Sequence, residues 1–389
     1  MYILTMSVFP SLVVLLLTAQ AIPQAPQHNG FEAVAKQADA ARSADHLNEA
    51  LALYSKGVQM RPKWSEGWWS LGSLLYEQDR FPEAQVAFAH FVATSSKPGP
   101  GYAFLALCEY EKRDYEASLK HFQAWGKAGS PGNDALIDVA GFHWALLLTH
   151  ESKFEQALYL LAAKAAKLGG SPVLAEAMGL ASLRMTNLPE DYPPGKHEMV
   201  WLAGEAALYA AEQDYARSDE YAHRLATRYG GEANVHYFLG TLLGFQRKLP
   251  EAVEEYKKEL QISPEHVPAM VELALAQLEN YKPEEALSAA AHAAALEPKN
   301  ARAHLAYGKA LLATERLPEA AHELETAKML APESPGVRSA LANTYLRLGR
   351  VAEAKRESQA FIALKEKEES AGPGKRKSGS PQQGAPSTQ

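Results

Sequence analysis

The stretch that decides the fold spans residues 233–368 and begins ANVHYFLGTLLGFQRKLPEAVEEYKKELQISPEH (233–266). The next two stretches, VPAMVELALAQLENYKPEEALSAAAHAAALEPKN (267–300) and ARAHLAYGKALLATERLPEAAHELETAKMLAPES (301–334), have the same length, and residues 335–368 keep the phase. Small residues recur at the eighth position of each segment, where they let two helix backbones approach closely: Gly240, Ala274, Gly308 and Ala342. A proline near the end of each complete segment stops a helix. A repeat of 34 residues with these features predicts tandem helix pairs.

The pattern resembles the tetratricopeptide repeat (TPR) family. The closest segment is 65–98, where the family's W, L, G, Y, A and F positions hold Trp68, Leu71, Gly72, Leu75, Ala84 and Phe88. Three residues depart from the pattern: Glu259 stands where a small residue is usual, and Ala290 and Ser358 stand where an aromatic is usual. The resemblance implies an all-α fold, a right-handed superhelical solenoid of stacked antiparallel helix pairs with an extended concave face.

The phase divides the chain into predicted segments. We expect a signal peptide at 1–21, a linker at 22–30, N-terminal TPR units at 31–170 and C-terminal TPR units at 233–370. The units at 171–232 are degenerate, because a helix predicted at Pro172–Thr186 is followed by a proline-rich loop at 187–197. Either this repeat decayed while the stack survived, or the loop is a hinge or binds a partner. Residues 371–389 lack large apolar side chains and predict a disordered basic tail.

The N-terminus carries the only targeting signal in the sequence. Residues 1–21 contain no charged side chain, and the apolar run Leu12–Leu17 is followed by Thr18-Ala19-Gln20-Ala21. This is typical of a secretory signal peptide with an A-x-A cleavage site, although the usual early Lys or Arg is missing. We expect export to the periplasm or secretion after cleavage at Ala21, as in a bacterial exported TPR protein. An uncleaved N-terminal anchor is the alternative.

Composition and motifs argue against several classes of function. The formal net charge is −7, which disfavours nucleic acid as a partner. No phosphate-binding loop, dinucleotide fingerprint or nucleophile elbow is present. The single Cys108 predicts a buried thiol among apolar neighbours. The 13 histidines are scattered over separate repeats and are expected to be ordinary surface or groove residues, so we predict no metal, no cofactor and no small-molecule substrate.

Candidate binding residues follow from the resemblance. In TPR proteins the first helix of each pair lines the concave face, and its groove positions fall here on aromatic, amide and basic residues. The predicted peptide-binding groove consists of Trp69, Tyr76, Tyr110, Phe142, Asn234, Tyr237, Thr241, Phe245, Arg302, Lys309, Asn343 and Arg347. Aromatic anchors beside a basic end would suit an extended peptide with an acidic part.

The sequence therefore predicts a non-catalytic scaffold that binds peptide or protein segments, working in assembly of a complex at the cell envelope. One alternative is a structural protein that self-associates through its terminal repeats, because the last helix carries Phe361, Ile362 and Leu364. A metal-dependent enzyme is a further alternative without a supporting motif. The oligomeric state is open.

Overall fold

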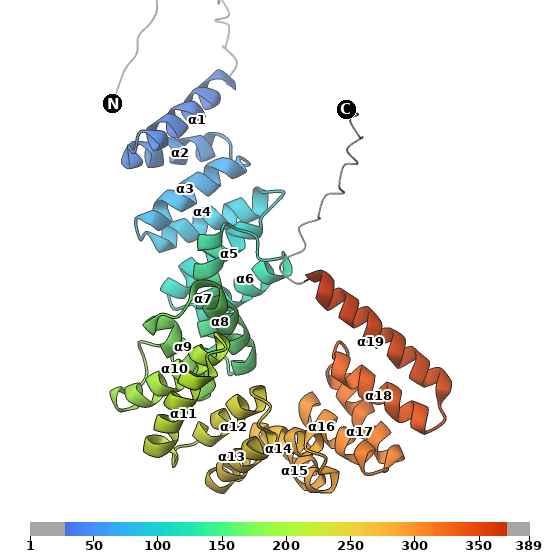
Figure 1. The fold of residues 1–389 in the computed structure, drawn as a ribbon. Coiled ribbons are helices and arrows are strands. Elements are labelled where there is room, and N and C mark those ends of the chain that lie inside the picture. Colours follow the sequence, from blue (N-terminus) through green and yellow to red (C-terminus); the bar gives the residue numbers. More distant parts are fainter. Residues whose placement is uncertain (1–27, 372–389) are drawn as a thin grey trace, which may run out of the picture. The chain divides into compact units, whose positions relative to one another are not determined.

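The computed structural model describes residues 28–371, and all of its regular structure is helical (Figure 1). The predicted signal peptide, linker residues 22–27 and tail residues 372–389 lie outside the described part. Within it, the prediction of an all-α protein built from stacked helix pairs is confirmed. Helix α1 begins at His28, three residues before the predicted first unit, and α19 ends at Ala371. No described helix is both long and apolar enough to cross a bilayer.

The chain forms two compact units that divide within α7, between Ala140 and Gly141. The first unit contains α1 (His28–Ser43), α2 (Leu47–Met60), α3 (Ser65–Glu77), α4 (Phe81–Thr94), α5 (Gly99–Glu111), α6 (Tyr115–Lys127) and the start of α7 (Asp134–His150). The second continues with α8 (Phe154–Leu168), α9 (Pro172–Ser182), the 3-10 turn η1 (Pro194–Lys196), α10 (His197–Ala211), α11 (Tyr215–Tyr229), α12 (Val235–Phe245), α13 (Leu249–Ile262), α14 (Val267–Glu279), α15 (Pro283–Leu296), α16 (Ala301–Ala313), α17 (Leu317–Leu330), α18 (Pro335–Arg347) and α19 (Val351–Ala371).

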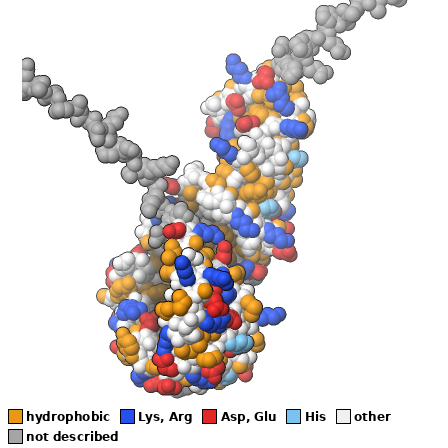
Figure 2. All heavy atoms as spheres, turned by 90° about the vertical axis from the view of Figure 1, so that its right-hand side faces the viewer, with side chains coloured by type: hydrophobic (Ala, Val, Ile, Leu, Met, Phe, Trp, Pro, Cys, Tyr) orange, Lys and Arg blue, Asp and Glu red, His pale blue; other side chains and the backbone are white. Residues whose placement is uncertain are grey.

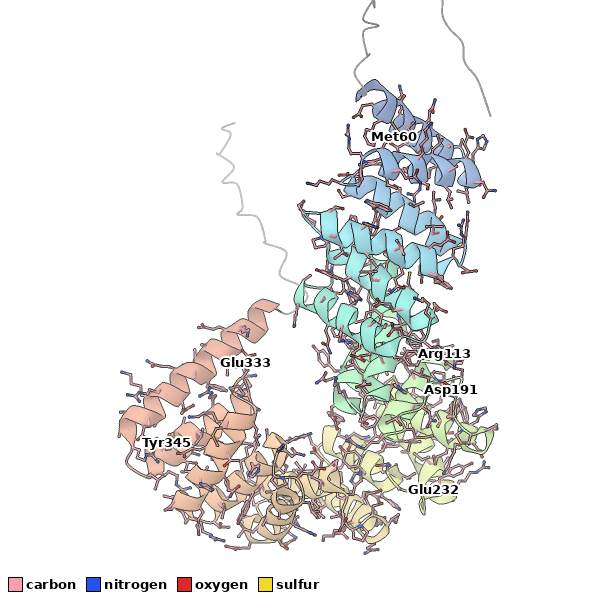
Figure 3. All side chains as sticks on the ribbon, turned by 180° about the vertical axis from the view of Figure 1, so that it is seen from behind. Met60, Arg113, Asp191, Glu232, Glu333 and Tyr345 are labelled. Carbon is pink, nitrogen blue, oxygen red and sulfur yellow. The ribbon has the colours of Figure 1, made fainter. Side chains whose placement is uncertain are left out.

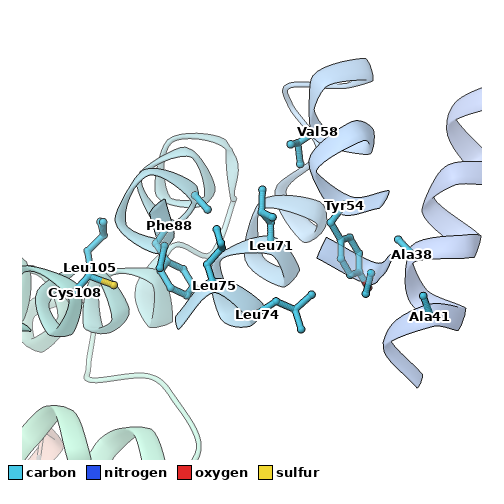
Figure 4. Packing of buried hydrophobic residues seen from close by; sticks show 13 residues of the cluster. Ala38, Ala41, Tyr54, Val58, Leu71, Leu74, Leu75, Phe88, Leu105 and Cys108 are labelled. Atoms are coloured by element: carbon cyan, nitrogen blue, oxygen red, sulfur yellow. The ribbon is translucent and has the colours of Figure 1, made fainter. Parts of the chain in front are cut away.

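In the first unit, consecutive helices bury one continuous apolar core. Figure 4 shows part of it, with Tyr54, Leu71, Phe88 and Cys108 packed between successive helices. Gly72 is required here, because a Cβ at this position would lie 2.9 Å from the Phe88 ring. The small eighth position and the aromatic second-helix position predicted from the repeat pattern thus meet across one interface.

The turn between the two helices of a repeat has a recurring geometry. Its central residue adopts a positive φ, as at Asp79, Arg247 and Glu315. The next amide donates to a carbonyl five residues back, for example Arg80 N–H to Leu75 O at 2.9 Å. This bond satisfies a carbonyl that the ending helix would otherwise leave unpaired. The turn between α18 and α19 has Gly349 at this position, whereas Asp79, Arg247 and Glu315 hold their side chains in a left-handed conformation that glycine adopts more easily.

In the second unit, the repeat without a second helix is closed by direct contact between α9 and α10. The helices run antiparallel, with Gly179 against the carbonyl of Val200 and Gly204 against that of Ala175. A Cβ on Gly179 would lie 2.0 Å from the Val200 oxygen, and one on Gly204 would lie 1.9 Å from the Ala175 oxygen. The two backbones therefore touch at a crossing that only glycine permits.

The predicted helix at Pro172–Thr186 is too long, because α9 ends at Ser182 and Arg184 adopts φ 53°. The loop that follows packs onto the protein. Leu188 and Tyr192 are buried, and the Tyr192 hydroxyl donates to Glu176 Oε1 at 2.6 Å. Asp191, labelled in Figure 3, lies on this loop. Its role as a hinge or partner-binding loop stays a prediction.

Candidate partner-binding surface

The predicted groove residues of the second unit differ widely in exposure. Phe245, at the end of α12, is 74 % exposed, whereas Tyr237 on the same helix is only 7 % exposed. On α16 and α18, Lys309 and Asn343 are exposed. These residues can contact a partner directly, while Tyr237 cannot without a rearrangement of the core.

Tyr237 packs inside the unit. Its ring lies 5.0 Å from that of His266 and 6.1 Å from that of Tyr256, and the Arg184 guanidinium lies 5.5 Å above it. Burial raises the pKa of Tyr237 to about 12. Half-buried Thr241 donates its hydroxyl to the Tyr237 carbonyl at 2.9 Å. The groove assignment for Tyr237 therefore needs correction: its side chain supports the wall and does not form the contact surface.

Asn234 belongs to a capping network around a fully buried carboxylate. Glu259 accepts hydrogen bonds from the backbone amides of Asn234 at 2.8 Å and Tyr237 at 3.2 Å. These amides start α12, so the negative charge sits at the positive end of that helix. The departure of Glu259 from the family pattern thus has a structural cause: from the second helix it caps the first helix of its own repeat.

His266 completes this network. Its Nδ1 accepts from the Ala269 amide at 3.0 Å, so Nε2 carries the proton and donates to Asn234 Oδ1 at 2.8 Å. Burial lowers the pKa of His266. The neutral ring therefore links the start of α14 to the start of α12.

Two ion pairs lie beside Tyr237. Arg184 donates to Glu155 Oε1 at 2.7 Å and stacks over Phe154 at 4.6 Å. Burial would raise the pKa of Glu155, but the hydrogen bond and charge of Arg184 outweigh it and lower this pKa. Arg302 approaches Glu272 at 2.5 Å, and burial raises the pKa of Glu272. Arg302, predicted as a groove cation, already has an acidic partner within the chain.

The exposed end of the groove lies on α16 and α18. Arg347 forms an ion pair with Glu315 and donates to the Leu312 carbonyl at 3.0 Å, so it joins two repeats. Lys309, by contrast, forms no ion pair within the described residues. Among the predicted basic groove residues, Lys309 is the one whose charge is available to a partner. Acidic and basic side chains are otherwise interspersed on the face shown in Figure 2.

In the first unit the predicted aromatic groove residues pack against other aromatic side chains of the same unit. Trp69 is half-buried, with its ring 5.4 Å from Phe104 and 5.0 Å from Phe91. Tyr76 lies 5.3 Å from Phe104, and burial raises its pKa to about 12. Half-buried Tyr110 is 5.6 Å from the ring of Tyr115. Through Phe104, Trp69 and Tyr76 join an inter-repeat cluster, and all three predicted rings are only partly exposed.

Phe142 lies on α7, in the second unit. It is half-buried and its ring is 5.7 Å from that of its neighbour His143. The predicted aromatic groove residues therefore divide between the two units, with Trp69, Tyr76 and Tyr110 in the first and Phe142 and Phe245 in the second.

Several histidines are exposed, as expected, but two others form pairs with carboxylates inside the repeats. His236 pairs with Glu255 and His304 with Glu323, each within one repeat. Arg338 and Glu357 form the same pair in the last repeat, again 19 residues apart. His304 and Arg338 also donate to the carbonyl of the proline six residues earlier, at 3.0 and 2.9 Å. Basic and acidic residues recurring at this spacing are the sequence signal that could have revealed these pairs.

The remaining chemistry is sparse. Cys108 is completely buried, as predicted, and burial raises the pKa of its thiol to about 12, so little thiolate forms at neutral pH. Across residues 28–371, no three His, Cys, Asp or Glu side chains gather in a way that could hold a metal ion. What the described surface offers is shape, aromatic edges and paired charges.

Two tetratricopeptide repeat models match the sequence, at residues 35–89 and 277–340. The chain contains tetratricopeptide repeats. The matched TPR segments lie one in each compact unit. A structure of MamA from Desulfovibrio magneticus RS-1, from its residue 41 to its end, is similar at 19 % identity and a TM-score of 0.40, covering 44 % of this chain and 96 % of that one. MamA from MSR-1 is similar at 19 % identity and a TM-score of 0.37, covering 44 % and 98 %. No curated protein matches the chain.

Proposed function

We propose that this TPR protein is a non-catalytic scaffold that binds extended protein segments. The binding surface would lie on α12, α14, α16 and α18, the first helices of four consecutive repeats. The observation that carries the proposal is that one unit presents both an exposed aromatic side chain, Phe245 on α12, and an exposed cation, Lys309 on α16. Helices that are already ordered need little further ordering when a partner binds, which favours affinity. The partner segment would bring an apolar residue to Phe245 and an acidic residue to Lys309.

A matched pair of variants tests this proposal. Phe245 is 74 % exposed at the groove end of α12, and Tyr159 is 73 % exposed on α8, the second helix of its repeat. We expect Phe245→Ala combined with Lys309→Glu to reduce partner recovery in quantitative co-purification, while Tyr159→Ala leaves it unchanged. Circular dichroism of each variant checks that the helices persist. Equal partner recovery from both variants would remove the groove assignment.

We further propose that the protein is exported and acts in assembly of a complex at the cell envelope. The support is the uncharged, apolar sequence of residues 1–21 with its A-x-A site. Sequencing the N-terminus of protein purified from its own cells tests this, because cleavage after Ala21 leaves Ile22 as the first residue. Protein that retains Met1 and partitions with membranes would favour the uncleaved anchor instead.

A further inference from the structure

The last helix pair of the second unit leaves a hollow on its outer side. The hollow has a volume of about 410 Å³ and is lined by Ala342, Asn343, Leu346, Val351, Ala354, Lys355 and Ser358. Leu346 is 61 % exposed and Val351 is 64 % exposed. Tyr345, labelled in Figure 3, marks the α18 helix beside it. Two large apolar side chains therefore face solvent at the end of the described repeats.

The corresponding positions one repeat earlier are covered by a helix. Leu312, Ala321 and Leu324 occupy the places of Leu346, Lys355 and Ser358, and all three are buried. Ala321 and Leu324 pack in one cluster with Val337, Leu341 and Tyr345 of α18. The hollow at the end of the array thus has the form that accepts an amphipathic helix elsewhere in the same unit.

The charge of the hollow differs from that of the equivalent positions on α16 and α17, one repeat earlier. Lys355 is the only charged residue in its lining, and it forms no ion pair within residues 28–371. We propose that this end face binds an amphipathic helix of another protein, which covers Leu346 and Val351 with apolar residues and places a carboxylate against Lys355. The hollow shares Asn343 with the predicted groove, but neither Phe245 nor Lys309 lines it, so variants at those two residues separate the two proposals.

Segments of this chain fit the hollow poorly. Residues 372–389 contain no large apolar residue and carry three positive charges and no acid. Two copies joined face to face would bring Lys355 against Lys355, a like-charge contact. The exposed side chains of α1 from residue 30 onward include Glu32, Lys36 and Gln37 and no large apolar residue, so a head-to-tail contact would leave the hollow unfilled. A helix from a different protein is the occupant that charge and shape favour.

The test uses the full-length protein and two fluorescent peptides derived from residues 334–348, the helix that covers the equivalent hollow. In the acidic peptide, the arginines at 338 and 347 are replaced by glutamate; the basic peptide keeps them. By fluorescence anisotropy, we expect saturable binding of the acidic peptide. Lys355→Glu should weaken it about fivefold or more, since an exposed ion pair contributes up to about 1 kcal/mol and reversal adds repulsion. Leu346→Asp should abolish it, whereas Phe245→Ala should leave it unchanged.

Four outcomes would overturn the proposal. The first is that neither peptide binds saturably. The second is that Lys355→Glu and Leu346→Asp leave binding of the acidic peptide intact. The third is a concentration-dependent dimer in light scattering that Leu346→Asp abolishes, which would make a second copy the occupant. The fourth is a rise in peptide affinity when residues 372–389 are removed, which would assign the hollow to the chain's own tail.

Discussion

Gly204 lies where the backbones of α9 and α10 touch, so adding one methyl group there tests that crossing directly. In Gly204→Ala, the new Cβ would stand 1.9 Å from the Ala175 oxygen, whereas ordinary contact begins at 3.4 Å. The helices must therefore move apart, because the obstacle is a main-chain carbonyl that cannot rotate away. A gap of about 0.5–1 Å already forfeits a quarter to a half of a packing contact.

The expected loss of stability follows from this separation. Overpacking in a core typically costs about 1–3 kcal/mol, and we expect about 3 kcal/mol or more here because backbone meets backbone. Gly141 in α7 provides the matched control, since a Cβ there would have nothing within 4 Å. Gly141→Ala should stabilise the protein by up to about 1 kcal/mol, the difference in helix propensity. The two identical substitutions should thus act with opposite sign.

Urea denaturation followed by circular dichroism measures both variants. Because repeat arrays need not unfold in one step, hydrogen exchange should accompany it, and the amides of α9 and α10 should exchange faster only in Gly204→Ala. If Gly204→Ala were as stable as the parent protein, with unchanged exchange in α9 and α10, then the direct crossing would be wrong, and with it the explanation of how the stack continues without a second helix.

The remaining predictions concern the cap, the histidine and the turns. Glu259→Ala should destabilise the protein by about 2–6 kcal/mol, because it leaves two amides unpaired at about 1–3 kcal/mol each. Glu259→Gln keeps one acceptor and should lose less, and equal losses in denaturation would contradict the cap. The folded-state pKa of His266 is lowered, so the unfolded chain binds the proton more readily than the folded protein. Neutral His266 therefore contributes to folding stability above its ordinary pKa of 6.5, and this stability is lost as the pH falls below 6.5. Melting temperatures measured against pH should show this loss of stability, and His266→Gln should make the curve flatter. A His266→Gln curve parallel to that of the parent protein would refute this role of His266. Tyr281→Gly should raise stability by about 0.5–1 kcal/mol, because Tyr281 has φ 58° and is 92 % exposed, and a lower denaturation midpoint would contradict the strain.

The repeat period predicted most of the fold because its signals are local. Small residues at the eighth and twentieth positions, and prolines at the ends of second helices, act within one helix pair. The period also located the disturbed repeat between 171 and 197. It could not show that Gly179 and Gly204 bring the backbones of α9 and α10 into contact there, because that contact depends on a helix being absent.

The exposure of the predicted groove residues was harder to predict, for a similar reason. Tyr237 occupies a groove position, yet Arg184 from the disturbed repeat and His266 at the start of α14 enclose it. Likewise, Glu259 departs from the family pattern, and only its hydrogen bonds to the amides at the start of α12 explain it. Exposure at a groove position depends on adjacent repeats, so it could be read from spacing for Phe245 and Lys309 but not for Tyr237.

Site-specific photocrosslinking in living cells tests the central claim most directly. A photoreactive amino acid at Phe245 should capture a defined protein partner, and mass spectrometry should place the crosslink on an extended segment with a nearby acidic residue. The same amino acid at Tyr159, which is equally exposed at 73 % against 74 %, should capture none of that partner. The claim is that α12, α14, α16 and α18 form the binding surface. Equal capture from both positions, or capture only from Tyr159, would contradict it.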